Sequence, residues 1–129
     1  MWGGSAICCG RNGCIMLGSN ISFTGDCHIV SRKRISIGNN CMISWGTLFM
    51  DTDSHQIYQD GIQINPDQAI VIENDVWIGS NCTLLKGTII PEGSIVAAGS
   101  VISKKVEQEK SIITGSPLKI LKTGVSWLK

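Results

Sequence analysis

Aromatic side chains and long apolar runs are both scarce in this chain. Phe, Trp and Tyr make up 5% of its 129 residues, which disfavours a compact core built from large side chains. No run of 18 or more apolar residues occurs, and the first thirty residues lack the charged start and apolar centre of a signal peptide. We therefore expect a cytoplasmic protein that does not insert into a membrane.

Neither sign of charge dominates the sequence. Eleven Lys and Arg stand against ten Asp and Glu, for a net charge of +1, so the overall balance does not favour nucleic acid as a partner. The six cysteines show no metal-ligand spacing, and without a secretory signal they are expected to be free thiols rather than disulfides. We expect one domain, residues 1–129, with no metal site.

What the chain has instead is a repeat with a period of six residues. One column of aliphatic residues recurs without a miss at Ile72, Ile78, Leu84, Ile90, Val96 and Ile102. Four positions after each comes a small or β-branched residue, at Val76, Cys82, Thr88, Ser94, Ser100 and Val106. The same pattern holds more loosely upstream, at Leu17, Phe23, Ile29, Ile37, Ile43 and Phe49, and there Cys27 and Cys41 occupy the small position. Packing therefore accounts for Cys27, Cys41 and Cys82.

A period of six predicts a stacked, three-sided solenoid. Six residues give a short strand and a turn, and three such units close a coil of about eighteen residues. No single coil can bury its own apolar face, so stability comes from stacking coils about 4.8 Å apart. The sequence predicts an all-β fold with coils at about 15–54 and 70–107 and a C-terminal tail at 108–129. Residues 1–14 fit the register poorly and are expected to form a partial cap or a trimmed end.

The six-residue pattern fails between Phe49 and Ile72, which predicts one extruded loop at about 51–69. Loops on a rigid scaffold are where binding and catalytic residues concentrate. This loop holds His55, one of two histidines in the chain. An imidazole with an ordinary pKa near 6.5 can accept a proton at pH 7, and Asp53 is the nearest group that could fix its tautomer. From position alone, a solvated loop residue is an equal alternative for His55.

Four strings in a fixed order connect the chain to a known family. They are D-T-D-S-H at 51–55, V-W-I-G-S-N at 76–81, A-A-G-S-V-I-S-K at 97–104 and G-S-P-L-K-I-L-K at 115–122. Together they resemble the hexapeptide-repeat O-acetyltransferases, a group that includes galactoside and maltose acetyltransferases and tailoring enzymes of surface polysaccharides. The likeness covers roughly residues 15–122. It implies a left-handed parallel β-helix, whose handedness periodicity alone cannot show, and a homotrimer with active sites between subunits.

The resemblance also implies roles for individual residues. His55 would be the general base that takes a proton from an acceptor hydroxyl as its oxygen attacks the thioester of acetyl-CoA. Ser80 and Ala98 would contact the pantetheine arm through their backbone. Lys119 and Lys122 would face the phosphates as point charges, at positions where relatives commonly carry arginine. The full set of cofactor contacts implied in this way is Trp77, Ser80, Ala98, Ser103, Lys104, Lys119 and Lys122.

The sequence indicates less about the acetyl acceptor than about the acetyl donor. Where sugar-specific relatives carry an asparagine, this sequence offers Thr24 with Asp26 nearby, and a hydroxyl of a sugar or polysaccharide precursor is favoured on family frequency. Two alternatives stay open: a non-catalytic β-helix scaffold, and an N-acetyltransferase of a sugar nucleotide or amino acid. A carbonic anhydrase of the same fold is disfavoured, because it needs three histidines around zinc and the chain has two.

Overall fold

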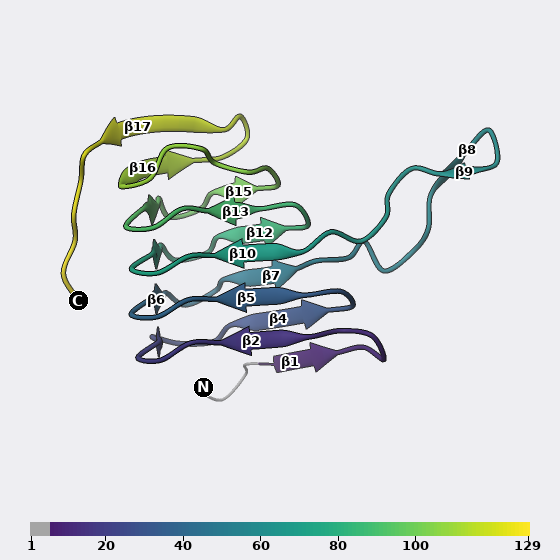
Figure 1. The fold of residues 1–129 in the computed structure, drawn as a ribbon, viewed down its shortest axis with the longest axis horizontal. Helices are drawn as coiled ribbons and strands as arrows, with labels where there is room; N and C mark the ends of the chain where they lie inside the picture. Colours follow the sequence, from purple (N-terminus) through teal and green to yellow (C-terminus); the bar gives the residue numbers. More distant parts are fainter. Residues whose placement is uncertain (1–5) are drawn as a thin grey trace.

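The computed structural model describes residues 6–129, which form a three-sided column of stacked coils (Figure 1). Within these residues every regular element is a strand. One coil consists of β2 (Ile15–Leu17), β3 (Ser22–Phe23) and β4 (His28–Ser31). The same order of three strands recurs in β5 (Ile35–Ile37), β6 (Met42–Ile43) and β7 (Leu48–Met50), in β10 (Ile70–Ile72), β11 (Trp77–Ile78) and β12 (Thr83–Leu85), and in β13 (Ile89–Ile90), β14 (Ile95–Val96) and β15 (Val101–Ile102).

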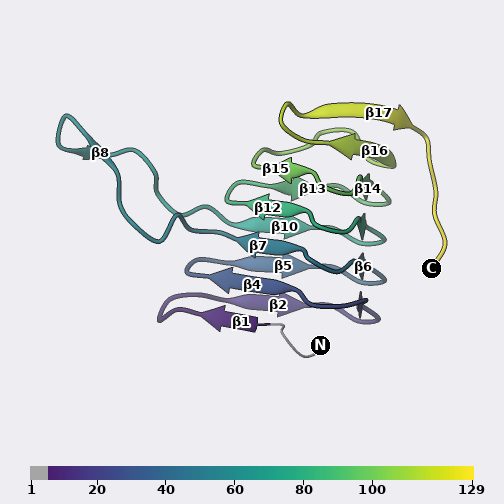
Figure 2. The ribbon, with the colours of Figure 1, turned by 180° about the vertical axis from the view of Figure 1, so that it is seen from behind.

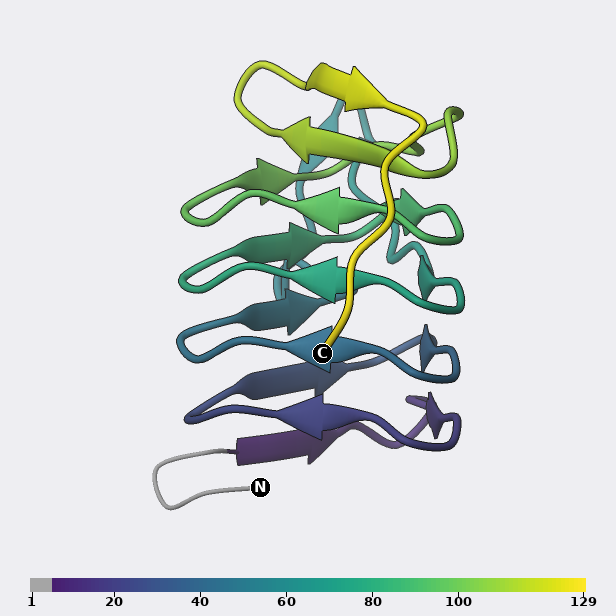
Figure 3. The same cartoon turned by 90° about the vertical axis from the view of Figure 1, so that its left-hand side faces the viewer.

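Equivalent strands of successive coils pair in parallel, and the three resulting sheets are the faces of the column (Figure 3). They run in the orders β1 (Ala6–Cys9)-β4-β7-β12-β15, β13-β10-β5-β2, and β17 (Lys119–Thr123)-β16 (Ser111–Thr114)-β14-β11-β6-β3. On the first face Ile29 pairs with Phe49, Phe49 with Leu84, and Leu84 with Ile102. All four side chains are almost completely buried, so the inward aliphatic column and the fold class predicted from the repeat are confirmed.

The corners between faces hold the small residues of the second column. The thiols of Cys27, Cys41 and Cys82 are fully buried, and removal from water raises the pKa of each. Among residues 6–129 the six cysteines form no disulfide bond. At the corner before β6 and β11 the chain turns through Asn40 and Asp75, both with φ near +60°. Asn and Asp tolerate this left-handed conformation better than other side chains, which suits them to tight corners.

The stack extends beyond both limits expected from the repeat. At the lower end β1 pairs with β4 and sets Ile7 below Ile29, so the described stack already includes Ala6–Cys9, before the expected start near residue 15. At the upper end β16 pairs with β14, and Ile113 continues the buried column above Val96. Thr114 therefore ends the stack, after which β17 turns back antiparallel to β16. The expectation for residues 1–5 lies outside the described residues.

Between β7 and β10 the chain leaves the column in one long excursion, residues 51–69 (Figures 1 and 2). Its far end is a hairpin of β8 (Tyr58–Gln59) and β9 (Ile62–Gln63). The column resumes in register across the break, since Ile70 pairs with Ile35 and Ile72 with Ile37. The excursion can therefore project from the corner without disturbing the stack. No helix capable of crossing a membrane is found in the described part of the chain.

Candidate functional site

The excursion is anchored at its root by a buried carboxylate. Asp51 is fully buried, and it accepts hydrogen bonds from Ser31 Oγ at 2.7 Å, the Arg32 amide at 2.7 Å and the Lys33 amide at 3.0 Å. Arg32 in turn donates from Nη1 to the Ser54 carbonyl at 2.9 Å. The turn after β4 therefore holds the first residues of the excursion against the coil below.

His55 is held in place through its backbone by Asn65. The buried Asn65 amide donates from Nδ2 to the His55 carbonyl at 2.8 Å and accepts from the Ile57 amide at 2.7 Å. The His55 side chain is exposed and lines a cavity of about 220 Å³. The rest of the lining is mostly polar and comprises Arg32, Thr52, Ser54, Gln56, Gln63, Asn65, Pro66 and Asp67. The imidazole thus faces a small polar space on a braced loop.

Asp53 is bound to Lys86 and to Asn65. Its Oδ2 lies 2.9 Å from Lys86 Nζ and accepts a hydrogen bond from Asn65 Nδ2 at 3.0 Å. The hydrogen bond from Lys86, and after it that from Asn65, holds the pKa of Asp53 below its usual value. The structure therefore connects Asp53 to His55 through the Asn65 amide, which binds the Asp53 carboxylate and the His55 carbonyl at once.

A second cavity, a groove of about 430 Å³, brings together three of the expected cofactor residues, Trp77, Ser80 and Ala98. Ser80 and Ala98 follow β11 and β14, which are neighbours in the same sheet. Between them the backbones approach closely, because a Cβ at Gly79 would lie 2.7 Å from the Ala98 nitrogen. The other lining residues are Thr24, Met42, Ser44, Trp45, Gly79, Ile95, Val96 and Ala97. The groove is therefore mainly apolar, with backbone near its surface.

The remaining expected cofactor residues lie at the upper end of the column. Ser103 and Lys104 line a small cavity of about 140 Å³ with Val101, Ile102, Ser116, Pro117 and Leu118. Lys119 and Lys122 are exposed on β17, outside the lining of this cavity. Within residues 6–129 no group of three or more His, Cys, Asp or Glu is arranged to hold a metal ion.

The His55 cavity and the groove have no lining residue in common. The excursion leaves the column after β7, whereas the groove lies on the face that contains β6, β11 and β14. A single protomer therefore presents the imidazole and the groove at separate places. Sequence reasoning did not identify Arg32, Asp51 or Asn65, although Asp51 opens the D-T-D-S-H string and could have been found there.

Comparison with known proteins supports the fold. Residues 69–104 match the family description "Bacterial transferase hexapeptide (six repeats)". WbbJ of Escherichia coli (strain K12), a candidate lipopolysaccharide biosynthesis O-acetyl transferase, is 32% identical over an alignment of 120 residues that covers 85% of this chain and 61% of that protein. The solved structure of the polysialic acid O-acetyltransferase OatWY superposes with a TM-score of 0.83 at 34% identity, over 90% of this chain and 57% of that one.

A third relative was solved with acetyl coenzyme A bound. It is a hexapeptide-repeat containing acetyltransferase of Vibrio cholerae O1 biovar eltor, 27% identical with a TM-score of 0.62 over 83% of this chain and 64% of that one. This chain spans under two thirds of the length of each of these three relatives.

Proposed function

The chain belongs to the hexapeptide-repeat acetyltransferase family, and on that premise we propose that it transfers an acetyl group from acetyl-CoA to a hydroxyl. The observation that carries the proposal is the groove at Trp77, Ser80 and Ala98. Its apolar lining suits the pantetheine arm, whose amides can bond to backbone groups near the groove surface. At the upper end of the column, the adenosine end of the cofactor and its phosphates would bind to Ser103, Lys104, Lys119 and Lys122.

His55 is the proposed general base. Its exposed imidazole accepts the proton of the acceptor hydroxyl as the hydroxyl oxygen attacks the thioester carbonyl. Backbone N–H groups stabilise the oxyanion, the thioester C–S bond breaks, and the leaving CoA thiolate takes up the proton that His55 accepted. The donor and acceptor are bound together, so no covalent acetyl-enzyme forms. Asn65 and Asp53 contribute by holding the His55 backbone.

The separation of His55 from the groove supports a shared active site. In a homotrimer His55 of one protomer would face the groove of the next, and neither protomer would hold a complete site alone. Trp45 beside the groove and Val101 on the neighbouring face are 56% and 40% exposed, and flank-to-flank packing would bury such side chains. Analytical ultracentrifugation tests this proposal: a trimer is expected, and a fully active monomer would contradict it.

A sugar or polysaccharide precursor is the proposed acceptor. The polar lining of the His55 cavity suits a hydroxylated molecule, and two relatives are named for O-acetyl transfer, WbbJ in lipopolysaccharide biosynthesis and OatWY on polysialic acid. Thr24 and Trp45 both line the groove, so Thr24 would contact the acceptor if His55 of a neighbouring protomer faces that groove. Release of CoA thiol measured with matched hydroxyl and amine sugars distinguishes O-transfer from N-transfer.

His55→Ala tests the catalytic assignment, and His28→Ala is the matched control because it removes the other exposed histidine, on β4. We expect His55→Ala to lose about a hundred- to ten-thousand-fold in kcat while CoA still raises the melting temperature. His28→Ala should keep full activity. Near-normal turnover by His55→Ala would refute the role of the base, and a wild-type protein that CoA does not stabilise would favour a non-catalytic scaffold.

A further inference from the structure

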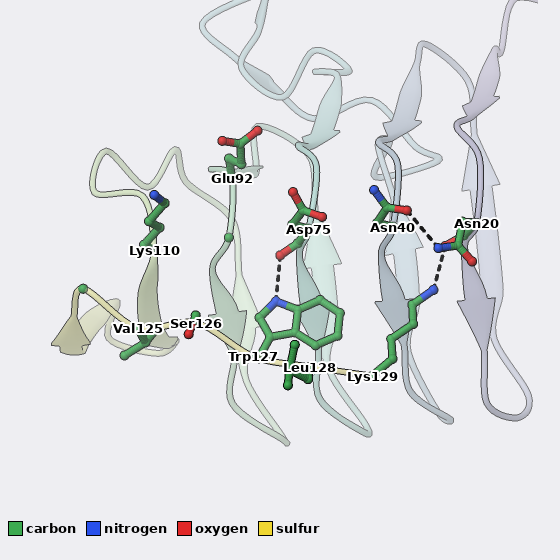
Figure 4. A pocket seen from close by; sticks show the side chains of 12 residues that line it. Asn20, Asn40, Asp75, Glu92, Lys110, Val125, Ser126, Trp127, Leu128 and Lys129 are labelled. Atoms are coloured by element: carbon green, nitrogen blue, oxygen red, sulfur yellow. Dashed lines mark hydrogen bonds between the residues drawn. The ribbon is translucent and has the colours of Figure 1, made fainter.

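After β17 the chain runs back down the outside of the column as a C-terminal strap, residues 124–129 (Figures 3 and 4). Three hydrogen bonds attach it at three levels of the stack. The Val125 amide donates to the Lys110 carbonyl at 2.9 Å, and Trp127 Nε1 donates to the Asp75 carbonyl at 2.7 Å. Lys129 Nζ donates to the Asn20 carbonyl at 2.7 Å. The strap therefore crosses from the last coil to the first along one corner.

The corner beside the strap is formed by backbone turns that recur along the column. Asn20, Asn40, Asp75 and Lys110 all lie at it with positive φ values of 50° to 60°, so their backbone turns at the same place in successive coils. A cavity of about 690 Å³ remains between the strap and the corner (Figure 4). The strap is thus attached at separate points, and Trp127 provides its aromatic contact with the column.

Trp127 packs against Trp77, which also lines the groove. The two ring centroids are 6.0 Å apart with the planes tilted by 44°, a geometry typical of favourable aromatic pairs. Trp77 donates from Nε1 to Ser44 Oγ at 3.3 Å, and Trp77 and Ser44 both line the groove proposed for the pantetheine arm. The Trp77 ring is therefore fixed by Trp127 from the strap and by Ser44 from the coil below.

We propose that Trp127 is a positioning residue that fixes the Trp77 indole as a wall of the acetyl-CoA groove. This inference rests on the proposed function, since it assumes that the groove takes the cofactor. Trp77 belongs to a two-residue strand and is only half-buried, so the aromatic contact restricts its side-chain rotamers. Without that contact the Trp77 indole is mobile, and ordering it on cofactor binding costs free energy and weakens affinity.

Three variants separate positioning from simple stabilisation of the column. Trp127→Ala removes the ring contact, whereas Trp127→Phe keeps an aromatic ring and loses only the hydrogen bond to the Asp75 carbonyl. Lys129→Met releases the end of the strap and leaves the ring pair in place. We expect Trp127→Ala to weaken CoA binding about two- to tenfold, the range given by an aromatic pair. Trp127→Phe should restore most of the affinity, and Lys129→Met should match the wild type.

CoA affinity is measured by calorimetry well below the melting temperature, together with acetyl-CoA kinetics. The KM of Trp127→Ala should rise while kcat changes little, because the lost interaction is made equally in the ground and transition states. Acrylamide quenching of Trp77, in a background of Trp2→Phe and Trp45→Phe, should increase with Trp127→Ala relative to Trp127→Phe. If wild type binds CoA and Trp127→Ala binds it equally well, the inference is wrong. If wild type binds no CoA, the proposed function fails and the inference fails with it.

Discussion

Asn65 is the residue at which one substitution should most affect the His55 loop. Its amide joins the two sides of the excursion through bonds to the His55 carbonyl and the Ile57 amide, and it also bonds to Asp53. Each bond to a neutral group contributes about 1 kcal/mol net. The bond to Asp53 adds little, because that side chain is 41% exposed. Asn65→Ala should therefore favour opening of the loop by about 2 kcal/mol, or roughly thirtyfold.

Hydrogen exchange at the Ile64 amide measures this opening. Ile64 donates to the Ile57 carbonyl at 2.9 Å, a bond that Asn65 does not make, so its exchange reports the state of the whole hairpin. The thermal unfolding of the column should change little, because the three partners of Asn65 all lie in the excursion. Gln59→Ala, an exposed amide on β8, is the control. Unchanged exchange at Ile64 in Asn65→Ala, with unchanged kcat, would refute the bracing role of Asn65.

Other predictions follow from the buried column and from Asp53. Phe49→Ala should lower the free energy of unfolding by about 3–5 kcal/mol, measured by denaturant titration, because Phe49 is fully buried between Ile29 and Leu84; a loss under 1 kcal/mol would contradict this packing. A thiol reagent at pH 8 should modify the exposed cysteines rapidly and the others only after unfolding, since burial raises the pKa of Cys27, Cys41 and Cys82. The pKa of Asp53 is lowered in the fold. The stabilisation from its ion pair with Lys86 is therefore fully present above about pH 3.9, the ordinary pKa of an aspartate, and is lost as the pH falls through the lowered pKa. Peptic cleavage of the loop should therefore increase between about pH 4 and pH 2 in the wild type. Asp53→Asn, which already lacks the ion pair, should show a smaller increase. If cleavage depends on pH equally in both proteins, the ion pair does not hold the loop.

The repeat predicted the column well because an inward position tolerates only a narrow range of side chains. Ser80 and Ala98, which the family resemblance assigned to the cofactor, line one groove because residues eighteen apart occupy equivalent places in neighbouring coils. The upper limit was missed because the buried column steps from Val96 to Ile113, which is seventeen residues and breaks the period. Handedness came from family resemblance rather than from periodicity.

The contacts that brace the site follow no repeat, which is why sequence patterns did not reveal them. Asn65 reaches His55 through the particular path of the excursion. Trp127 reaches Trp77, fifty positions earlier in the sequence, from a tail without periodicity. Such contacts depend on tertiary geometry, and neither composition nor spacing encodes them in a recognisable form.

The most direct test of the shared active site is subunit mixing between two inactive variants. His55→Ala lacks the base, and Ala98→Trp fills the groove at an exposed position with a bulky ring. The two proteins, carrying different tags, are unfolded together in equal amounts, refolded and assayed for CoA thiol release. If His55 of one protomer serves the groove of the next, random assembly gives about a quarter of the sites an intact base and an intact groove, and the mixture should recover about that fraction of wild-type activity. A refolded mixture of confirmed hetero-oligomers that stays as inactive as its parents would contradict the shared site.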